Sequence, residues 1–303
     1  MAAEAVYGLP PAGLATSGPD AIQVSPLIVG ASAIESLADA SLDRLVIAAP
    51  PGTLERRYVL AHGLRALREG GEIVALAPKA KGGARLGGEL AGFGCEVREN
   101  ARRHQRICRA ARPARLVGAE AAIAAGGPRI VPALGLWSQP GVFSWDRLDP
   151  GTALLLAQRW TPAGNGADFG CGYGALARAV LASPAVTRLA LIDIDRRALD
   201  AARRNIDDQR AHFLHCDLRR PPPSGLGELD FVIMNPPFHD GGAEDRSLGQ
   251  ALVATAAAML GPGGLCRLVA NVALPYETTL AASFAHVALV ARGGGYKVLE
   301  ARR

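Results

Sequence analysis

The 303-residue sequence lacks the features of a secreted, metal-binding or membrane-spanning protein. Its five cysteines are odd in number and never form a Cys-x-x-Cys pair, which argues against a disulfide framework or a zinc site and favours reduced thiols in a cytoplasm. No apolar run reaches about 18 residues, the length of a transmembrane helix. The first eight residues have neither the positive start nor the apolar stretch of a signal peptide. We therefore expect a cytoplasmic protein with no metal and no membrane span.

Lysine is scarce as well. Only Lys79, Lys81 and Lys297 occur, so arginine carries nearly all of the positive charge. The formal net charge of +5 and the pI of about 9.2 are compatible with a polyanionic partner but do not require one. The hydrophobic share of 49% is sufficient for a core, and the length corresponds to one large domain or two modest ones. Composition alone therefore names no function.

The second half of the sequence alternates short apolar strands with amphipathic helices. Strands alternating with helices form a parallel α/β sheet, whose ligands bind at the carboxyl ends of the strands. The turn chemistry near the end of the chain predicts a closing β-hairpin. The strands are predicted to end at Phe169, Ile192, His215, Met234 and Ala270, the helices to cover 175–182, 195–206, 250–260 and 277–284, and the hairpin to turn at Gly293-Gly294-Gly295.

The first half contains an altered copy of this pattern. Residues 45–51 (Leu-Val-Ile-Ala-Ala-Pro-Pro) align with residues 231–237 (Phe-Val-Ile-Met-Asn-Pro-Pro), and in both copies a helix, a Gly-Gly pair and another strand follow. We interpret this as an internal duplication, joined by Pro- and Gly-rich chain between 113 and 140; the alternative is coincidence between α/β units. Ala49 stands where Asn235 stands in the second copy, and an alanine side chain forms no hydrogen bond. Because residues 1–44 also lack an acid-x-Gly-x-Gly turn, we predict that the first copy is catalytically inactive.

The second copy has a glycine-rich turn between a strand and a helix, running from Asp168 to Gly174. Gly170 and Gly172 allow a ligand to approach the backbone closely, and Asp193, at the end of the next strand, can bind both hydroxyls of a ribose. The glycines alternate, unlike the Gly-x-Gly-x-x-Gly of NAD-binding proteins. An acid two residues before the first glycine would repel a pyrophosphate but suits a cationic amino-acid group. The pattern favours S-adenosylmethionine, although such a turn can also serve plain helix–strand packing.

The fourth predicted strand is followed by Asn235-Pro236-Pro237-Phe238. This tetrapeptide resembles motif IV of class I methyltransferases that modify a planar, amide-like nitrogen. An exocyclic amine on a base is a poor nucleophile because its lone pair is delocalised. The Asn235 side-chain carbonyl and the Pro236 backbone carbonyl can accept its two N–H bonds, so much of the catalysis is positioning, and Phe238 can stack on a flipped base. The alternative is a simple turn after a strand.

Taken together, five segments resemble the RsmC family of 16S ribosomal RNA guanine-N2 methyltransferases. The resemblance covers nearly all of residues 135–303 and is looser in the first half, which is shorter than in the family. It implies two tandem Rossmann-like class I methyltransferase domains, a degenerate one over 1–134 that binds RNA or supports the fold, and a catalytic one over 135–303. The segments are Pro140 to Ser144, Leu148 to Thr152, Asp168 to Gly174, Asn235 to His239 and Asn271 to Glu277.

The resemblance also implies roles for individual residues. Asp168, Gly170 and Gly172, with Cys171 between the glycines, are expected to hold the methionine end of S-adenosylmethionine. Asp193 is expected to bind the ribose and Asp217 the adenine amino group, and Asn235 is expected to contact the cofactor as well as the substrate amine. Phe143 is expected against the cofactor or substrate pocket, with an ordinary core position as its alternative. The expected reaction is methylation of the exocyclic N2 amine of a guanine in ribosomal RNA, with 16S RNA favoured.

Three alternatives stay open at this point. N6-adenine and protein-glutamine methyltransferases act on a similar nitrogen, but they more often have tyrosine where Phe238 stands. A non-catalytic RNA-binding assembly factor could keep the same fold. Seven arginines around the end of the first copy could neutralise RNA phosphates or form only a solvated hairpin edge. They are Arg98, Arg102, Arg103, Arg106, Arg109, Arg112 and Arg115.

Overall fold

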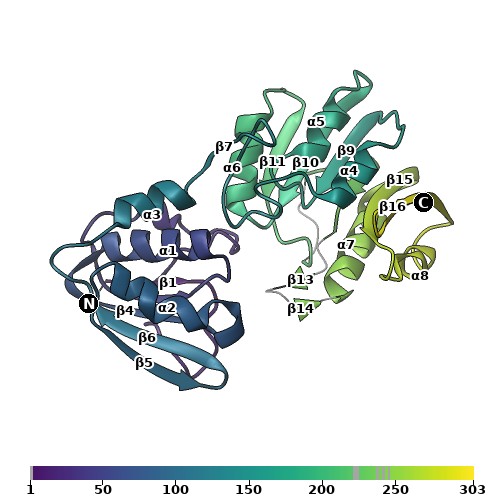
Figure 1. The fold of residues 1–303 in the computed structure, drawn as a ribbon. Coiled ribbons are helices and arrows are strands. Elements are labelled where there is room, and N and C mark those ends of the chain that lie inside the picture. Colours follow the sequence, from purple (N-terminus) through teal and green to yellow (C-terminus); the bar gives the residue numbers. More distant parts are fainter. Residues whose placement is uncertain (1–2, 221–224, 237–238, 241–242, 245) are drawn as a thin grey trace. The chain divides into compact units, whose positions relative to one another are not determined.

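The computed structural model describes residues 3–220, 225–236, 239–240, 243–244 and 246–303 (Figure 1). The chain divides into two compact units. The first unit comprises Met1–Arg129 with Gln139–Gly141, and the second unit comprises Ile130–Ser138 with Val142–Arg303. Each unit has its own sheet and its own hydrophobic core. No helix within the described ranges is long and apolar enough to cross a membrane.

The first unit is built on a six-stranded sheet in the order β2-β1-β3-β4-β6-β5. Strands β2, β1, β3 and β4 are parallel, and the hairpin β5–β6 runs antiparallel to β4. The strands are β1 (Glu4–Tyr7), β2 (Ile22–Gln23), β3 (Leu42–Ala48), β4 (Leu67–Pro78), β5 (Val97–Arg102) and β6 (Gln105–Ala111). The helices are η1 (Ile34–Ser36), α1 (Thr53–Ala66), η2 (Lys79–Lys81), α2 (Gly83–Gly92) and α3 (Ala119–Gly126).

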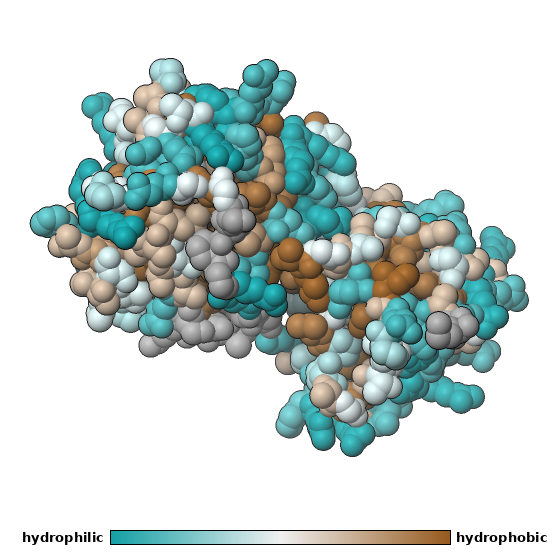
Figure 2. Space-filling model, turned by 180° about the vertical axis from the view of Figure 1, so that it is seen from behind, coloured by the Kyte–Doolittle hydropathy of each residue, from teal (hydrophilic) through white to brown (hydrophobic). Residues whose placement is uncertain are grey.

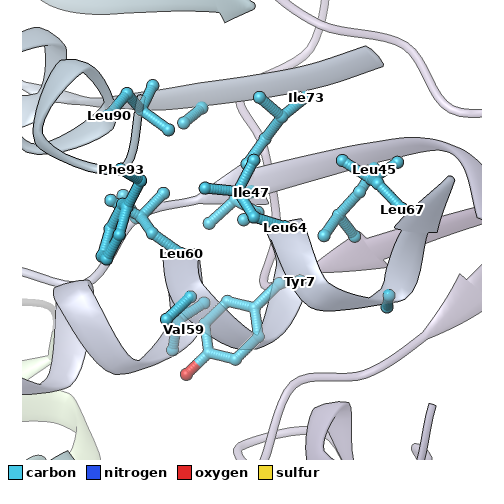
Figure 3. Packing of buried hydrophobic residues seen from close by; sticks show 14 of the residues in the cluster. Tyr7, Leu45, Ile47, Val59, Leu60, Leu64, Leu67, Ile73, Leu90 and Phe93 are labelled. Atoms are coloured by element: carbon cyan, nitrogen blue, oxygen red, sulfur yellow. The ribbon is translucent and has the colours of Figure 1, made fainter. Parts of the chain in front are cut away.

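The core of the first unit lies between the sheet and helix α1. Leu60 and Leu64 of α1 are fully buried with Ile47 of β3 and Ile73 of β4 (Figure 3). Each such side chain contributes roughly 1.5–3 kcal/mol through the surface it removes from water. Helix α1 approaches β3 closely at Gly63, where a Cβ atom would lie 2.5 Å from Leu45. A larger residue at position 63 would therefore push the helix off the sheet.

Part of the connection predicted between 113 and 140 belongs to the first unit instead. Helix α3 forms within it and packs on α1, with Gly126 so close to Tyr58 that a Cβ atom would lie 2.3 Å from the Tyr58 Cβ. The boundary between the two units, at Arg129 and Ile130, lies within this connection. The helix inside it was not predicted, because close helix packing through glycine leaves little trace in local hydrophobicity. The short strands β7 (Arg129–Val131) and β8 (Leu136–Ser138) follow α3 and pair with each other.

The second unit is built on a seven-stranded sheet in the order β11-β10-β9-β12-β15-β17-β16. The first five strands in this order are parallel, and the hairpin β16–β17 runs antiparallel to β15. The strands are β9 (Gly164–Phe169), β10 (Val186–Asp193), β11 (Ala211–His215), β12 (Leu229–Met234), β15 (Leu260–Asn271), β16 (His286–Gly293) and β17 (Tyr296–Arg302), with β13 (His239–Asp240) and β14 (Ala243–Glu244) paired apart from the sheet. The helices are α4 (Pro150–Leu156), α5 (Ala175–Leu181), α6 (Arg196–Asn205), α7 (Arg246–Met259) and α8 (Tyr276–Ala281).

Helices cover both faces of the second sheet. Apolar residues of α4, α5 and α6 pack on one face, and those of α7 and α8 pack on the other. Strands buried on both faces are continuously apolar, as Leu189 to Ile192 are in β10. Each unit also exposes some large apolar residues among the hydrophilic ones, as on the face in Figure 2. The predicted fold class, two tandem α/β units with parallel sheets, is confirmed.

The two sheets share the order of five strands, with β1-β3-β4-β6-β5 matching β9-β12-β15-β17-β16. Ile47 of β3 pairs with Tyr7 of β1, and its sequence counterpart Ile233 of β12 pairs with Asp168 of β9. Tyr7 therefore occupies the position of Asp168. The first sheet ends at the two-residue β2, so no described strand of the first unit corresponds to β11.

Candidate functional site

Four polar residues of the second unit lie at the same edge of its sheet. Asp168 is in β9, Asp193 ends β10, Asp217 follows β11 by two residues, and Asn235 directly follows β12. These strands are parallel neighbours in the order β11-β10-β9-β12, so their carboxyl ends point the same way. Ligands of open α/β sheets bind at this edge.

The glycine-rich turn leaves space at two of its three glycines. Gly170 and Gly172 have φ of 70° and 55°, and a Cβ atom built on either meets nothing within 4 Å. Gly174 differs, because its Cβ would lie 2.8 Å from Ile206, so it serves helix packing. The Cys171 side chain is buried in the core, and this burial raises the pKa of its thiol well above the ordinary value. Cys171 can therefore offer a ligand only its backbone.

Asp168 is a fully buried carboxylic acid. Neither of its carboxyl oxygens has a hydrogen-bond partner among the described residues. Burial, and then the charge of Asp193, raise the pKa of Asp168 to about 8, against a smaller opposite effect of the Ala177 backbone N–H. A buried carboxyl without a partner is costly, and a bound cation or hydrogen-bond donor would remove that cost.

Asp193 connects the glycine-rich turn to the next helix. Its Oδ2 accepts a hydrogen bond from the Gly172 N–H at 2.8 Å, and its Oδ1 accepts one from the Asp195 N–H at 2.8 Å. Asp195 in turn caps α6 by accepting from the Arg197 N–H. Burial raises the pKa of Asp193 to about 6 although the backbone donors act in the opposite direction. Each carboxylate oxygen keeps a lone pair for a further donor.

Asp217 is held by an arginine two residues away. Its two oxygens accept from the Arg219 side chain at 2.8 and 3.0 Å, and these bonds hold the pKa of Asp217 below its usual range. An ionised carboxylate at this place keeps acceptor capacity for an amino group.

The Asn235 amide is oriented by Asp149 and Thr152, which the sequence analysis named only as part of the segment Leu148 to Thr152. Its Nδ2 donates to Asp149 Oδ2 and to Thr152 Oγ1, both at 2.9 Å. An ionised carboxylate only accepts hydrogen bonds, so the nitrogen of the amide must face Asp149 and the oxygen must face away. Both N–H bonds of the amide are used, and Oδ1 is left as an acceptor. Asp149 also caps helix α4 through the Thr152 N–H at 2.8 Å, so the same acid begins a helix and fixes the amide.

The remaining predicted site residues fall in different surroundings. Pro236 is buried, and Phe238 lies outside the described residues. Phe143 is 61% exposed, so it is not a core residue. It follows Val142, which packs in one cluster with Tyr173 of the glycine-rich turn.

The corresponding edge of the first unit is closed by its own side chains. The Arg56 guanidinium is buried, donates to both oxygens of Glu89 at 2.6 Å, and donates to the backbone carbonyls of Pro50 and Pro51 at 3.2 and 2.7 Å. These carbonyls belong to the turn that corresponds to Asn235-Pro236-Pro237. Besides lacking an amide at Ala49, the first copy therefore has its turn carbonyls already bound.

Comparisons with known proteins place the second unit in a family. The model of the methyltransferase small domain matches residues 133–300, more than half of the chain. Ribosomal RNA small subunit methyltransferase C of Shewanella sp. (strain MR-4) is 39% identical over 162 residues, which are 52% of this chain and 46% of that protein. The protein of the same name from Pseudomonas aeruginosa (strain LESB58) is 37% identical over 169 residues, 55% of this chain and 50% of the relative. The chain thus matches about half the length of these curated relatives.

A solved structure resembles nearly the whole chain. It is the T. thermophilus 16S rRNA N2 G1207 methyltransferase RsmC in complex with AdoMet and guanosine, with a TM-score of 0.72 and 26% identity over 90% of this chain and 76% of that one. The chain belongs to the methyltransferase small domain family.

Proposed function

We propose that this protein transfers a methyl group from S-adenosylmethionine to the exocyclic N2 amine of a guanine in ribosomal RNA of the small subunit, in the cytoplasm. The family, the names of the curated relatives, and the AdoMet and guanosine bound to the similar solved structure support this function. In this proposal the catalytic domain is 135–303, and 1–134 binds RNA or supports the fold. The observation that carries the proposal is the fixed orientation of the Asn235 amide.

The residues at the sheet edge fit S-adenosylmethionine. The unpartnered carboxyl of Asp168 suits the ammonium of the methionine end, because a cation compensates a buried carboxylate. The open sides of Gly170 and Gly172 let a ligand approach the backbone. Asp193 and Asp217 keep acceptors for a ribose diol and an adenine amine. When bound, the cofactor supplies an electrophilic methyl group on a sulfonium.

The chain's own contribution to the reaction is to hold the amine. Asn235 Oδ1 accepts one N–H of the substrate amine, and the Pro236 carbonyl is placed after the same strand to accept the other. With both N–H bonds held, the nitrogen lone pair is directed out of the plane of the base, toward the electrophile. Asp149 and Thr152 prevent the Asn235 amide from turning its N–H groups toward the amine, which would repel it. The amine becomes acidic as the new bond forms and releases a proton to water.

The function is tested by methylating RNA with the purified chain. The chain is incubated with S-adenosylmethionine carrying a tritiated methyl group and with 16S RNA, either free or in small subunits, and the RNA is digested for mass spectrometry. N2-methylguanosine is the expected product. N6-methyladenosine, or label in protein glutamine, would overturn the assignment of the substrate.

A pair of matched variants tests the site. Asn235→Ala should lower the rate roughly a hundredfold or more, the scale for losing one preorganised hydrogen-bonding group, while the affinity for S-adenosylmethionine falls far less. Ala49→Asn, combined with Asn235→Ala, should restore nothing, because Arg56 binds the turn carbonyls and Tyr7 replaces the acid in the first copy. Robust activity of Asn235→Ala would refute the assignment of the active site to the second unit.

A further inference from the structure

The tip of the β5–β6 hairpin in the first unit has a costly backbone conformation. Arg103 and His104, the two turn residues, have φ of 48° and 61°. The matching turn of the second unit, between β16 and β17, has Gly294 and Gly295 at φ of 57° and 85°. Glycine adopts this conformation freely, whereas side chains with a Cβ atom disfavour it. The first unit thus has two basic residues at positions where the second unit has glycines, which adopt this conformation without strain. Backbone strain of this kind is typical of functional positions.

These side chains border a basic hollow of about 340 Å³. The described residues that line it include no acid, and their one aromatic side chain is the imidazole of His104. The opening can therefore attract an anion. The lining consists of Lys79, Ala101, Arg102, Arg103, His104, Gln105 and Arg106.

The basic side chains are held in place by groups that mostly leave their charge intact. Arg102 donates to the Gly13 carbonyl at 3.4 Å and Arg103 to the Ala12 carbonyl at 3.1 Å. A carbonyl is neutral, so it orders a guanidinium without cancelling its charge. Arg106 is the exception, with Glu99 at 2.9 Å. Ordered cations lose less entropy when they bind an anion than free side chains do.

The hollow lies at the edge of the sheet where α/β proteins bind ligands. Pro78, the last residue of the parallel strand β4, pairs with Gln105 beside the turn (Figure 1). In the second unit this edge carries Asp168 and Asn235. In the first unit Tyr7 and the buried Arg56 occupy the corresponding place, and the basic tip is exposed at the same edge.

We propose that the tip of the β5–β6 hairpin, residues 101–106 with Lys79, binds the sugar-phosphate backbone of the RNA substrate without reading its sequence. This inference rests on the proposed function for the identity of the RNA. Arginine and lysine side chains commonly bind phosphate oxygens, and such contacts position a nucleic acid without reading its sequence. Each phosphate contact releases counterions, so the affinity for RNA falls as the salt concentration rises. The slope of log affinity against log salt concentration is proportional to the number of phosphate contacts.

The test compares two double variants with the same change in charge. Arg102→Ala with Arg103→Ala removes two cations at the tip. Arg68→Ala with Arg115→Ala removes two exposed cations away from the tip. Arg68 lies at the start of β4, where it pairs with Asp43, and Arg115 lies four residues after β6. The affinity for fluorescent 16S RNA is measured by anisotropy from 50 to 250 mM KCl. The tip variant should bind at least tenfold more weakly at 150 mM, and its log–log salt slope should be shallower by about 1.5, whereas the control should lie close to the unmodified protein.

A second variant separates RNA binding from folding. Arg103→Gly with His104→Gly copies the Gly294-Gly295 turn and removes the backbone strain. Its melting temperature should be no lower than that of the unmodified protein, while its RNA affinity and salt slope fall. An unchanged slope in both tip variants, or an equal fall in the Arg68 and Arg115 control, would overturn the inference. Methyl transfer by the second unit is measured separately. If the protein transfers no methyl group but its salt slope still depends on the tip, the proposed function is refuted and this inference stands.

Discussion

Replacement of Asp168 by asparagine is expected to stabilise the free protein at neutral pH. The pKa of Asp168 is about 8 in the folded protein and 3.8 when unperturbed. At pH 7 the unfolded chain has therefore released a proton that the folded chain keeps. Keeping this proton lowers the free energy of unfolding by 2.303RT times the difference between the pH of 7 and the unperturbed pKa of 3.8, which is about 4 kcal/mol. The buried asparagine amide has unmet hydrogen bonds of its own, which cost roughly 1–3 kcal/mol, so a net gain of about 1–3 kcal/mol is expected.

The pH dependence makes this prediction independent of the cost of the amide. Because the folded pKa lies above the unfolded one, Asp168 lowers the stability as pH rises from about 4 to 8 and has no further effect above 8. The difference in unfolding free energy between Asp168→Asn and the unmodified protein should grow by about 1.4 kcal/mol per pH unit between pH 5 and 8. All three tryptophans, Trp137, Trp145 and Trp160, are in the second unit, so their fluorescence during denaturant unfolding reports on this unit. Two parallel stability curves over this range would refute the reasoning.

The same substitution should weaken the binding of S-adenosylmethionine. In the proposed function the ammonium of S-adenosylmethionine lies at Asp168, so binding should favour the ionised carboxyl and release a proton below pH 8. The affinity of the unmodified protein should therefore rise with pH from 6 to 8, by up to tenfold per unit, and that of Asp168→Asn should be lower and flatter. Calorimetry in buffers of different ionisation enthalpy measures both the affinity and the proton release. A higher stability without a loss of affinity would mean that the ammonium binds elsewhere.

Two further substitutions test the neighbours of this acid. In the proposed function Asp193 binds the ribose, and it also accepts the Gly172 N–H, so Asp193→Ala should weaken the binding of S-adenosylmethionine at least tenfold, on the order of 1.4 kcal/mol. An unchanged affinity in calorimetry would place the ribose elsewhere. Asp149→Asn keeps a good helix cap but lets the Asn235 amide turn over, so kcat should fall roughly tenfold with little change in cofactor affinity. If kcat in a steady-state methylation assay does not change, Asp149 does not orient Asn235 during the reaction.

Local patterns were sufficient to predict the edge on which the site is built. The ends of β9, β10 and β12 follow from apolar runs and from the polar residues that end them. The parallel order then places Asp168, Asp193 and Asn235 on adjacent strands, because carboxyl ends of parallel strands share an edge.

Contacts between distant residues were not predictable in this way. Asp149 and Thr152 lie 86 and 83 residues before Asn235, and no periodicity links them. Asp149 followed by Pro150 is nevertheless a local signal for the start of a helix, so the helix could have been placed but not the amide that its cap contacts. The positive φ of Arg103 and His104 is a local feature, but the sequence did not predict it either. Turns with this conformation usually contain Asn or Gly, and this turn contains neither.

The two units also explain why a single reversion cannot recover a second active site. A nucleoside cofactor needs acceptors on several adjacent strands at once, and the first sheet ends at β2, which has two residues. Tyr7 fills the place of the buried acid. Removal of Arg56 would leave Glu89 as a buried carboxylate without a partner. Breaking such a pair by removing one partner costs about 3–5 kcal/mol, so opening the turn carbonyls would destabilise the unit before any ligand could bind. This edge of the first unit is thus kept closed by the ion pair of Arg56 with Glu89.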